Sequence, residues 1–205
     1  MKPDFRVLLI LATIVILWKI DLGYSNPIIE KQVGPFRLSD PAFTEAKLVS
    51  EFGEGYVQVE KFGNKTIRIK HIFWVPEQEV WLKVSLSHVL NEKMQRVVEA
   101  VLVTKKQLCE KDKKYIATKK LASLATSKGI EINDSINKVI EKYGEPSISK
   151  VVGKDKTFTM LDEELKLKEG VVLRYLQSRR SKEMNFAEFY FKQKKLHSFL
   201  ISESE

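Results

Sequence analysis

The sequence is poor in the residues from which disulfide frameworks, metal sites and nucleophilic active sites are built. It has one cysteine, Cys109, in 205 residues, so no intrachain disulfide can form and the fold must depend on its hydrophobic core. The three histidines, His71, His88 and His197, lack the spacing and the neighbouring Cys and Asp residues of a metal site. No Gly-x-Ser-x-Gly motif occurs, and Cys109 has no evident catalytic partner. These absences predict a protein that is not an enzyme and that needs no metal or cofactor.

The N-terminal 25 residues have the composition of a secretory signal peptide. Two basic residues precede an apolar run at positions 7–18, which is shorter than the about 20 residues needed to cross a bilayer core. A small-x-small cleavage site ends at Ser25, and no cysteine near it could carry a lipid. We therefore expect a periplasmic or secreted protein that begins at Asn26. The alternative is an uncleaved inner-membrane anchor formed by residues 7–24.

The net charge of +8 is concentrated in one segment of the chain. Residues 105–128 hold eight lysines and no arginine, against Glu110 and Asp112. A nucleic-acid-binding face carries arginine as well and spreads its charge over a folded surface, so we expect no nucleic-acid partner. The segment is predicted to be a basic linker, helical from Cys109 to Ala125. Weak contact of Lys105–Lys128 with an anionic membrane surface is the alternative.

Two stretches of the chain share one pattern, 91 residues apart. TEAKLVSEFGEG (Thr44–Gly55) aligns with SINKVIEKYGEP (Ser135–Pro146). Each begins with a residue type that caps helices. The second continues with apolar residues at i, i+3, i+4 and i+7, the spacing of one buried helix face, namely Ile136, Val139, Ile140 and Tyr143. The first matches the last three of these positions with Leu48, Val49 and Phe52. Gly53 and Gly144 are predicted to take the left-handed conformation that ends a helix. The repetition indicates a tandem duplication.

After each predicted helix the apolar period changes from 3.6 to 2, the pattern of antiparallel strands. The fold class is therefore α+β, with two tandem units in which a short helical segment packs on an antiparallel β-meander. The first unit spans residues 26–104 and the second residues 129–205, with the linker between them. The expected strands are 66–75, 80–86 and 97–104 in the first unit, and 171–176, 185–191 and 196–202 in the second.

The motif of the second unit resembles a known family. GIEINDS followed by VIEKYGEP, within Gly129–Pro146, resembles the SmpA/OmlA family of bacterial outer-membrane assembly lipoproteins. A tandem pair of such units resembles the β-lactamase-inhibitor-protein-like fold. The resemblance implies a helical layer on an antiparallel sheet, an envelope location and a protein partner. The chain departs from both groups, because it lacks the lipid-bearing cysteine of the first and the disulfides of the second.

The strand alternation predicts aromatic side chains on the sheet face turned away from the helices. In residues 80–86 every second residue is apolar and core-facing, which leaves Trp81 on the opposite face. We expect this face to bind another envelope protein, because aromatics among Arg and Lys are typical of protein interfaces. The face would be closed if the linker or the other unit covered it. The alternative function is a binding module for a small apolar ligand or cell-wall component in the cleft between the units. The candidate protein-binding residues are Trp74, Trp81, Tyr175, Phe186 and Tyr190.

Overall fold

The structure is a computed structural model that describes residues 31–62, 65–90, 96–110, 115–117, 119–154, 158–160, 166–178 and 184–204. The predicted signal segment and its cleavage site lie outside these residues. Within the part that is described, no helix is long and apolar enough to cross a membrane.

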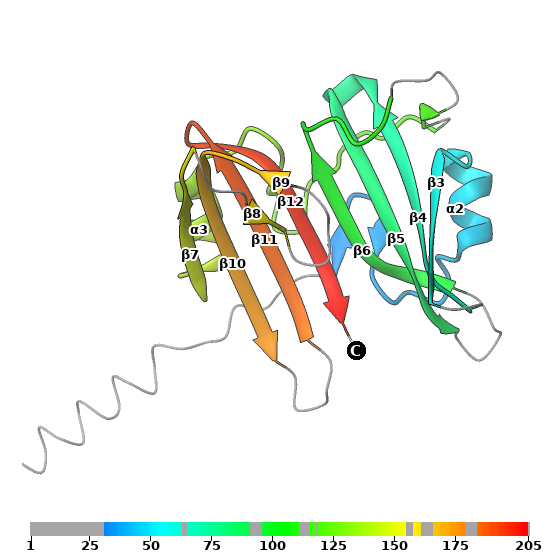
Figure 1. Ribbon diagram of the computed structural model, residues 1–205. Helices are drawn as coiled ribbons and strands as arrows, with labels where there is room; N and C mark the ends of the chain where they lie inside the picture. The colour runs from blue at the N-terminus through cyan, green and yellow to red at the C-terminus, as the bar shows by residue number, and fades with distance from the viewer. Residues whose placement is uncertain are drawn as a thin grey trace, which may run out of the picture.

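The fold is built on one antiparallel sheet of eight strands, in the order β3-β4-β5-β6-β12-β11-β10-β7 (Figure 1). The sheet is continuous across the predicted unit boundary, because β6 pairs with β12 from Ser198↔Thr104 to Ser202↔Ala100. We call this central pairing the seam. The strands are β3 (Tyr56–Phe62), β4 (Lys65–Val75), β5 (Val80–Leu90), β6 (Arg96–Thr104), β7 (Ile148–Val152), β10 (Gly170–Ser178), β11 (Met184–Lys192) and β12 (Lys195–Ser204).

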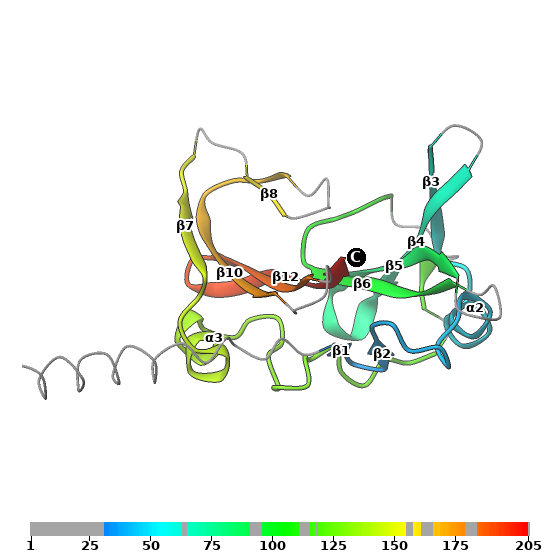
Figure 2. The ribbon, with the colours of Figure 1, turned by 90° about the horizontal axis from the view of Figure 1, so that it is seen from below.

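Different elements lie on the two faces of the sheet. Helices α2 (Glu45–Phe52) and α3 (Ile136–Tyr143) lie on one face, here the helix face, together with the hairpin of β1 (Gln32–Val33) and β2 (Phe36–Arg37) (Figure 2). On the opposite face, here the outer face, lies the small pair β8 (Phe158–Thr159) and β9 (Lys166–Leu167). The edge strands β3 and β7 turn towards the outer face (Figure 2). A 3₁₀ turn, η1 (Pro76–Gln78), joins β4 to β5.

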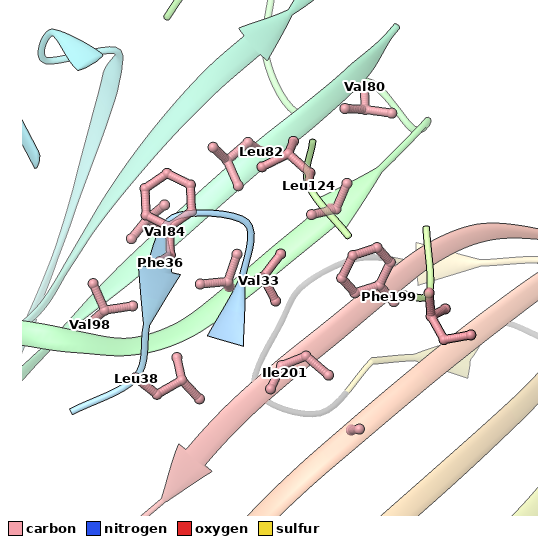
Figure 3. Close-up of a cluster of buried hydrophobic side chains, with 14 of the residues drawn as sticks. Val33, Phe36, Leu38, Val80, Leu82, Val84, Val98, Leu124, Phe199 and Ile201 are labelled. Atoms are coloured by element: carbon pink, nitrogen blue, oxygen red, sulfur yellow. The ribbon is translucent and has the colours of Figure 1, made fainter. Parts of the chain in front are cut away.

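The main hydrophobic core lies on the helix face and spans the seam. Val33 and Phe36 of the β1–β2 hairpin are fully buried, among side chains of β5, β6 and β12 that include Leu82, Val84, Val98 and Ile201 (Figure 3). Ser39 joins both halves, because its N–H donates to Val98 O of β6 at 2.8 Å and its hydroxyl to the Glu203 carboxylate of β12 at 2.5 Å. Lys31 also pairs with Glu203. The segment that follows the predicted signal peptide thus contributes to the fold.

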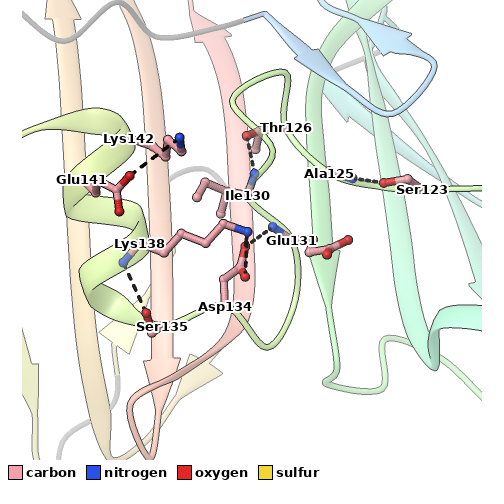
Figure 4. Close-up of polar contacts among 10 residues, drawn as sticks. All are labelled: Ser123, Ala125, Thr126, Ile130, Glu131, Asp134, Ser135, Lys138, Glu141 and Lys142. Carbon is pink, nitrogen blue, oxygen red and sulfur yellow. Dashed lines mark hydrogen bonds and ion pairs between the residues drawn. The ribbon is translucent and has the colours of Figure 1, made fainter.

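Helix α3 forms as its sequence predicts. Ser135 accepts a hydrogen bond from the Lys138 N–H at 3.2 Å, and Asp134 pairs with the Lys138 ammonium (Figure 4). Val139 and Tyr143 are buried. The helix ends at Gly144, whose φ of 79° is positive as expected. Its ψ of −161°, however, places it in the extended positive-φ region that only glycine occupies readily, not in the left-handed helical region.

Helix α2 has the same ending but a different start. Gly53 has φ 83° and ψ 179°, and its N–H donates to Val49 O, as the Gly144 N–H donates to Ile140 O. Thr44 precedes the helix in extended conformation but makes no side-chain capping bond. The two helix stops are therefore equivalent, whereas only α3 has a capped N-terminus.

The predicted linker helix from Cys109 to Ala125 is wrong. None of the described residues in this range is α-helical. Ile116 instead forms a parallel bridge to Trp74, while Leu121 and Leu124 enter the helix-face core one at a time. The apolar residues that suggested a helical stripe thus contact different parts of the sheet. The expected strands are all present with wider bounds, and β3 and β7 are additional edge strands that the sequence reading omitted.

Candidate functional site

The predicted aromatic binding surface is not an open surface. Trp81 is 1 % exposed and packs on Trp74 with ring centroids 5.4 Å apart. The chain after β6 reaches this place, because Ile116 bridges Trp74 and the Ala117 N–H donates to Trp74 O at 3.4 Å. Tyr115, the residue before, contacts the ring of Tyr56 at 5.3 Å. The expectation that Trp81 faces solvent is therefore wrong, and its ring belongs to the intramolecular packing.

Tyr175 lies on the helix face, contrary to the prediction. Its ring contacts Tyr143 of α3 at 5.3 Å and Phe189 at 5.9 Å, and its hydroxyl donates to Gly144 O at 3.1 Å. Burial, followed by the charge of Glu145, raises the pKa of this hydroxyl. A shift of one residue in the expected register moves a side chain to the other face of a sheet.

Phe186 and Tyr190 do face outward, but they are covered. They are 3 % and 2 % exposed and belong to a second core, on the outer face, with Met160 and Leu167 of the β8–β9 region. The five predicted residues are thus divided among three places in the fold: beneath the chain after β6, on the helix face, and beneath β8–β9. Within the described part of the chain, Tyr190 borders an opening in the surface.

That opening is a pocket of about 410 Å³ beside the seam. Its walls come from the residues directly after β6, from the end of β9, and from β11 and β12 where they meet at their turn. Two apolar groups, Leu167 and the Tyr190 ring, form part of the lining. The full set of lining residues is Lys106, Leu167, Lys168, Tyr190, Lys192 and His197.

A β-bulge brings His197 into the pocket. Tyr190 pairs with Ser198, but the next pair along the ladder is Phe191 with Leu196, so His197 is an extra residue in β12. A bulge re-aims a side chain that simple alternation would place elsewhere. The His197 ring lies edge-on to Tyr190 at 5.7 Å between centroids.

A chain of hydrogen bonds connects the pocket to the seam. The backbone N–H of Lys106 donates to Thr104 Oγ1 at 3.0 Å. Thr104 Oγ1 in turn lies 2.6 Å from Ser198 Oγ, which lies 3.0 Å from His197 Nδ1. Thr104 and Ser198 are fully buried and pair directly across β6 and β12. The ring position of His197 is therefore fixed by residues from both halves of the sheet.

The electrostatics of the pocket are dominated by lysine. Burial, and after it the charges of Lys192, Lys105 and Lys106, lower the pKa of His197 to about 4. The Tyr190 hydroxyl donates to Lys168 O at 2.7 Å, and burial, followed by the charge of Glu169, raises its pKa. The pocket is thus lined by three lysines beside an imidazole and a phenol that are both uncharged at neutral pH. Such a site attracts anions and repels metal cations.

Sequence reasoning found one residue of this pocket and missed the others. Tyr190 was a candidate, and Lys106 lay in the segment interpreted as a linker. His197 was not a candidate because the histidines lack the spacing of a metal site, and strand alternation gives no sign of a bulge. Lys168 follows β9 and Lys192 ends β11, and the place where these strands meet depends on the tertiary fold.

Other candidate chemistry is absent from the described residues. No three His, Cys, Asp or Glu side chains among them are arranged to hold a metal ion. Burial, followed by the charge of Glu110, raises the pKa of the partly buried Cys109 thiol, which disfavours the nucleophilic thiolate.

None of the protein-family models, curated proteins or solved structures compared with this chain matches it. The functional argument therefore depends on the geometry of the chain itself, and the resemblance to the SmpA/OmlA family stays a prediction.

Proposed function

We propose that this chain is a non-catalytic, exported binding protein whose lysine-lined pocket holds a small organic anion. The single observation that carries the proposal is the gathering of Lys106, Lys168 and Lys192 around one pocket of about 410 Å³. Ligand pockets have volumes of about 300–1,000 Å³. The proposal departs from the alternative function expected from the sequence, a binding module for a small apolar ligand or cell-wall component in the cleft between the units, because three lysines line this pocket.

The charge of the ligand follows from the lysines that line the pocket. Lys106, Lys168 and Lys192 each attract an anion that is bound among them. Lysine is a point charge with three donors, which suits phosphate and carboxylate oxygens. Leu167 and the Tyr190 ring add apolar contact area. The favoured ligand thus carries two or more negative charges on a small apolar or aromatic body.

The proposal includes a duplicated architecture. Each half of the sheet follows one helix with four of its strands: α2 with β3 to β6, and α3 with β7 and β10 to β12. The last strands of the halves, β6 and β12, pair at the seam. The matching conformations of Gly53 and Gly144 support descent from one repeated unit. In this interpretation the ligand pocket arose at the second half, through β9 and the bulge at His197, and Lys106 after β6 completes its lining.

A protein partner is the second candidate, at a different place from the aromatic residues. Val151 of the edge strand β7 is 76 % exposed, and Val59 of the opposite edge strand β3 is 48 % exposed. Edge strands bind proteins by accepting an additional strand, and apolar side chains favour that contact. Val151→Lys should then abolish capture of an envelope protein while leaving anion binding unchanged. Capture that is equal for Val151→Lys and the parent chain would contradict this candidate.

The experiment for the pocket is calorimetric titration of the chain with benzene-1,3-disulfonate, a doubly charged aromatic probe, and with benzyl alcohol as an uncharged probe. We expect the disulfonate to bind and the alcohol not to. Lys192→Glu should weaken binding about tenfold or more, since hydrogen bonds to charged groups contribute about 1.5–3 kcal/mol. Lys120→Glu, an equal change of net charge beside Leu121 of the helix-face core, should leave affinity within about twofold. Absence of binding, or equal losses in both variants, would refute the proposal.

A further inference from the structure

We propose that His197 couples ligand binding to protonation: an oxyanion in the lysine-lined pocket bonds to the Nε2–H of His197, and the complex takes up a proton there as the pH falls. The inference depends on the proposed function, because it concerns the same pocket. It adds the ligand group that is recognised, a phosphate or carboxylate oxygen, and a pH dependence of affinity.

The hydrogen-bond chain bears on which ring nitrogen meets the ligand. The backbone N–H of Lys106 can only donate, so Thr104 Oγ1 is its acceptor at 3.0 Å. Thr104 Oγ1 lies 2.6 Å from Ser198 Oγ, which lies 3.0 Å from His197 Nδ1, and the two hydroxyls can be arranged in either direction. When Thr104 donates to Ser198 and Ser198 donates to Nδ1, each hydroxyl donates one bond and accepts one bond. We assign this arrangement to the neutral imidazole, which makes it the Nε2–H tautomer with Nε2–H as the donor to a ligand.

The charged groups around His197 come from three parts of the fold. The free imidazole stays uncharged at neutral pH because it is partly buried among positive charges. A bound oxyanion changes that balance, since it offsets the ammonium charges and attracts the imidazolium form. The facing groups are Lys105 and Lys106 after β6, Tyr190 and Lys192 of β11, and Lys168 and Glu169 between β9 and β10.

The direction of the pH effect follows from linkage. The pKa of His197 is about 4 in the free protein, and a bound oxyanion raises it. Between the two pKa values the complex holds a proton that the free protein does not, so binding takes up a proton. Affinity therefore rises as the pH falls through this window and levels off below pH 4 and well above the pKa of the complex. Each unit by which binding raises the pKa strengthens binding about tenfold.

The protonated state uses the same residues with the hydroxyls reversed. Imidazolium Nδ1–H donates to Ser198 Oγ, and Ser198 donates to Thr104 Oγ1. Thr104 then accepts two bonds and loses Ser198 as the acceptor of its proton. The loss of an acceptor for the buried Thr104 hydroxyl opposes protonation of His197 in the free protein. Attraction between the imidazolium and a bound anion offsets this loss.

The test is calorimetric titration of the mature chain with benzene-1,3-disulfonate, which stays fully ionised throughout, in two buffers of different ionisation enthalpy. At pH 5 we expect net proton uptake on binding, and at pH 7.5 less uptake and weaker binding. His197→Gln retains an amide donor near the Nε2 position but cannot titrate. It should bind the probe without uptake and with an affinity that is nearly constant from pH 4.5 to 7.5.

Binding without proton uptake at pH 5, or equal uptake in His197→Gln, overturns the inference and leaves the proposed function intact. Absence of binding at every pH overturns both. The thermal melt of His197→Gln checks its fold. The imidazole carbon shifts of the parent chain, titrated with and without probe, give an independent answer. They must show the probe raising the pKa of His197, and an unchanged titration overturns the inference.

Discussion

Replacement of Trp81 by alanine separates an intramolecular core from a binding surface. The side chain is 1 % exposed and contacts Trp74 at 5.4 Å. A buried aromatic side chain removes about 150–250 Å² from water, worth about 4–6 kcal/mol at about 25 cal/mol per Å². Measured losses for Trp→Ala in cores are about 3–5 kcal/mol. We therefore expect Trp81→Ala to lower the free energy of unfolding by about 3–5 kcal/mol.

Urea unfolding of the mature chain measures this loss, and two variants calibrate it. Leu82→Ala, at a fully buried position on the helix face, should cost about 2–5 kcal/mol. Val59→Ala, at a side chain that is 48 % exposed, should cost less than about 0.5 kcal/mol. If Trp81→Ala lowers the free energy of unfolding as little as Val59→Ala does, the tryptophan is not packed inside the molecule. That result would support the open aromatic surface expected from the sequence.

Four further predictions concern stability and processing. Gly144→Ala should cost about 1–3 kcal/mol because φ is 79°, whereas Gly153→Ala, at a glycine without positive φ, should be nearly neutral by urea unfolding; an added Cβ meets nothing within 4 Å at either position. Ser135→Ala should cost about 1 kcal/mol through loss of its capping bond, and Thr44→Ala, which has no such bond, clearly less; equal losses would contradict the cap assignment. Arg174→Met removes the two N–H groups that donate, at 2.8 and 2.6 Å, to Oε1 of the fully buried Glu188 and should cost about 3–5 kcal/mol, with Arg174→Met/Glu188→Met recovering most of it. Exported protein should begin at Asn26 in N-terminal sequencing, and full-length chain in the membrane fraction would instead favour an anchor at residues 7–24.

The local elements were predictable because their signals are local. Helix α3 follows from four apolar residues at helical spacing between a capping serine and a glycine, and all of these act within one short segment. The strands follow from alternation in the same way. The positive φ of Gly144 was also predictable, because Pro146 leaves the chain no means of continuing the helix. Its ψ was not, since both positive-φ regions are open to glycine.

The joined sheet and the pocket were not predictable, because they depend on contacts between distant residues. Thr104 and Ser198 are 94 residues apart, and neither hydroxyl indicates that β6 and β12 will pair. The bulge at His197 changes one side chain's direction without changing the apolar pattern around it. In the linker a local signal was present but misleading. Leu121 and Leu124 have the spacing of one helical stripe, although they pack in the core without a helix.

The most direct test of the central claim is to map where a bound anion lies. Amide chemical shifts of the mature, ¹⁵N-labelled chain are followed during titration with benzene-1,3-disulfonate at pH 6. A specific pocket predicts saturable shifts concentrated at Lys106, Lys168, Tyr190, Lys192 and His197, all of which line it. Shifts that scatter over the exposed lysines of both sheet faces, or that never saturate, would show general charge screening and contradict an anion-binding site.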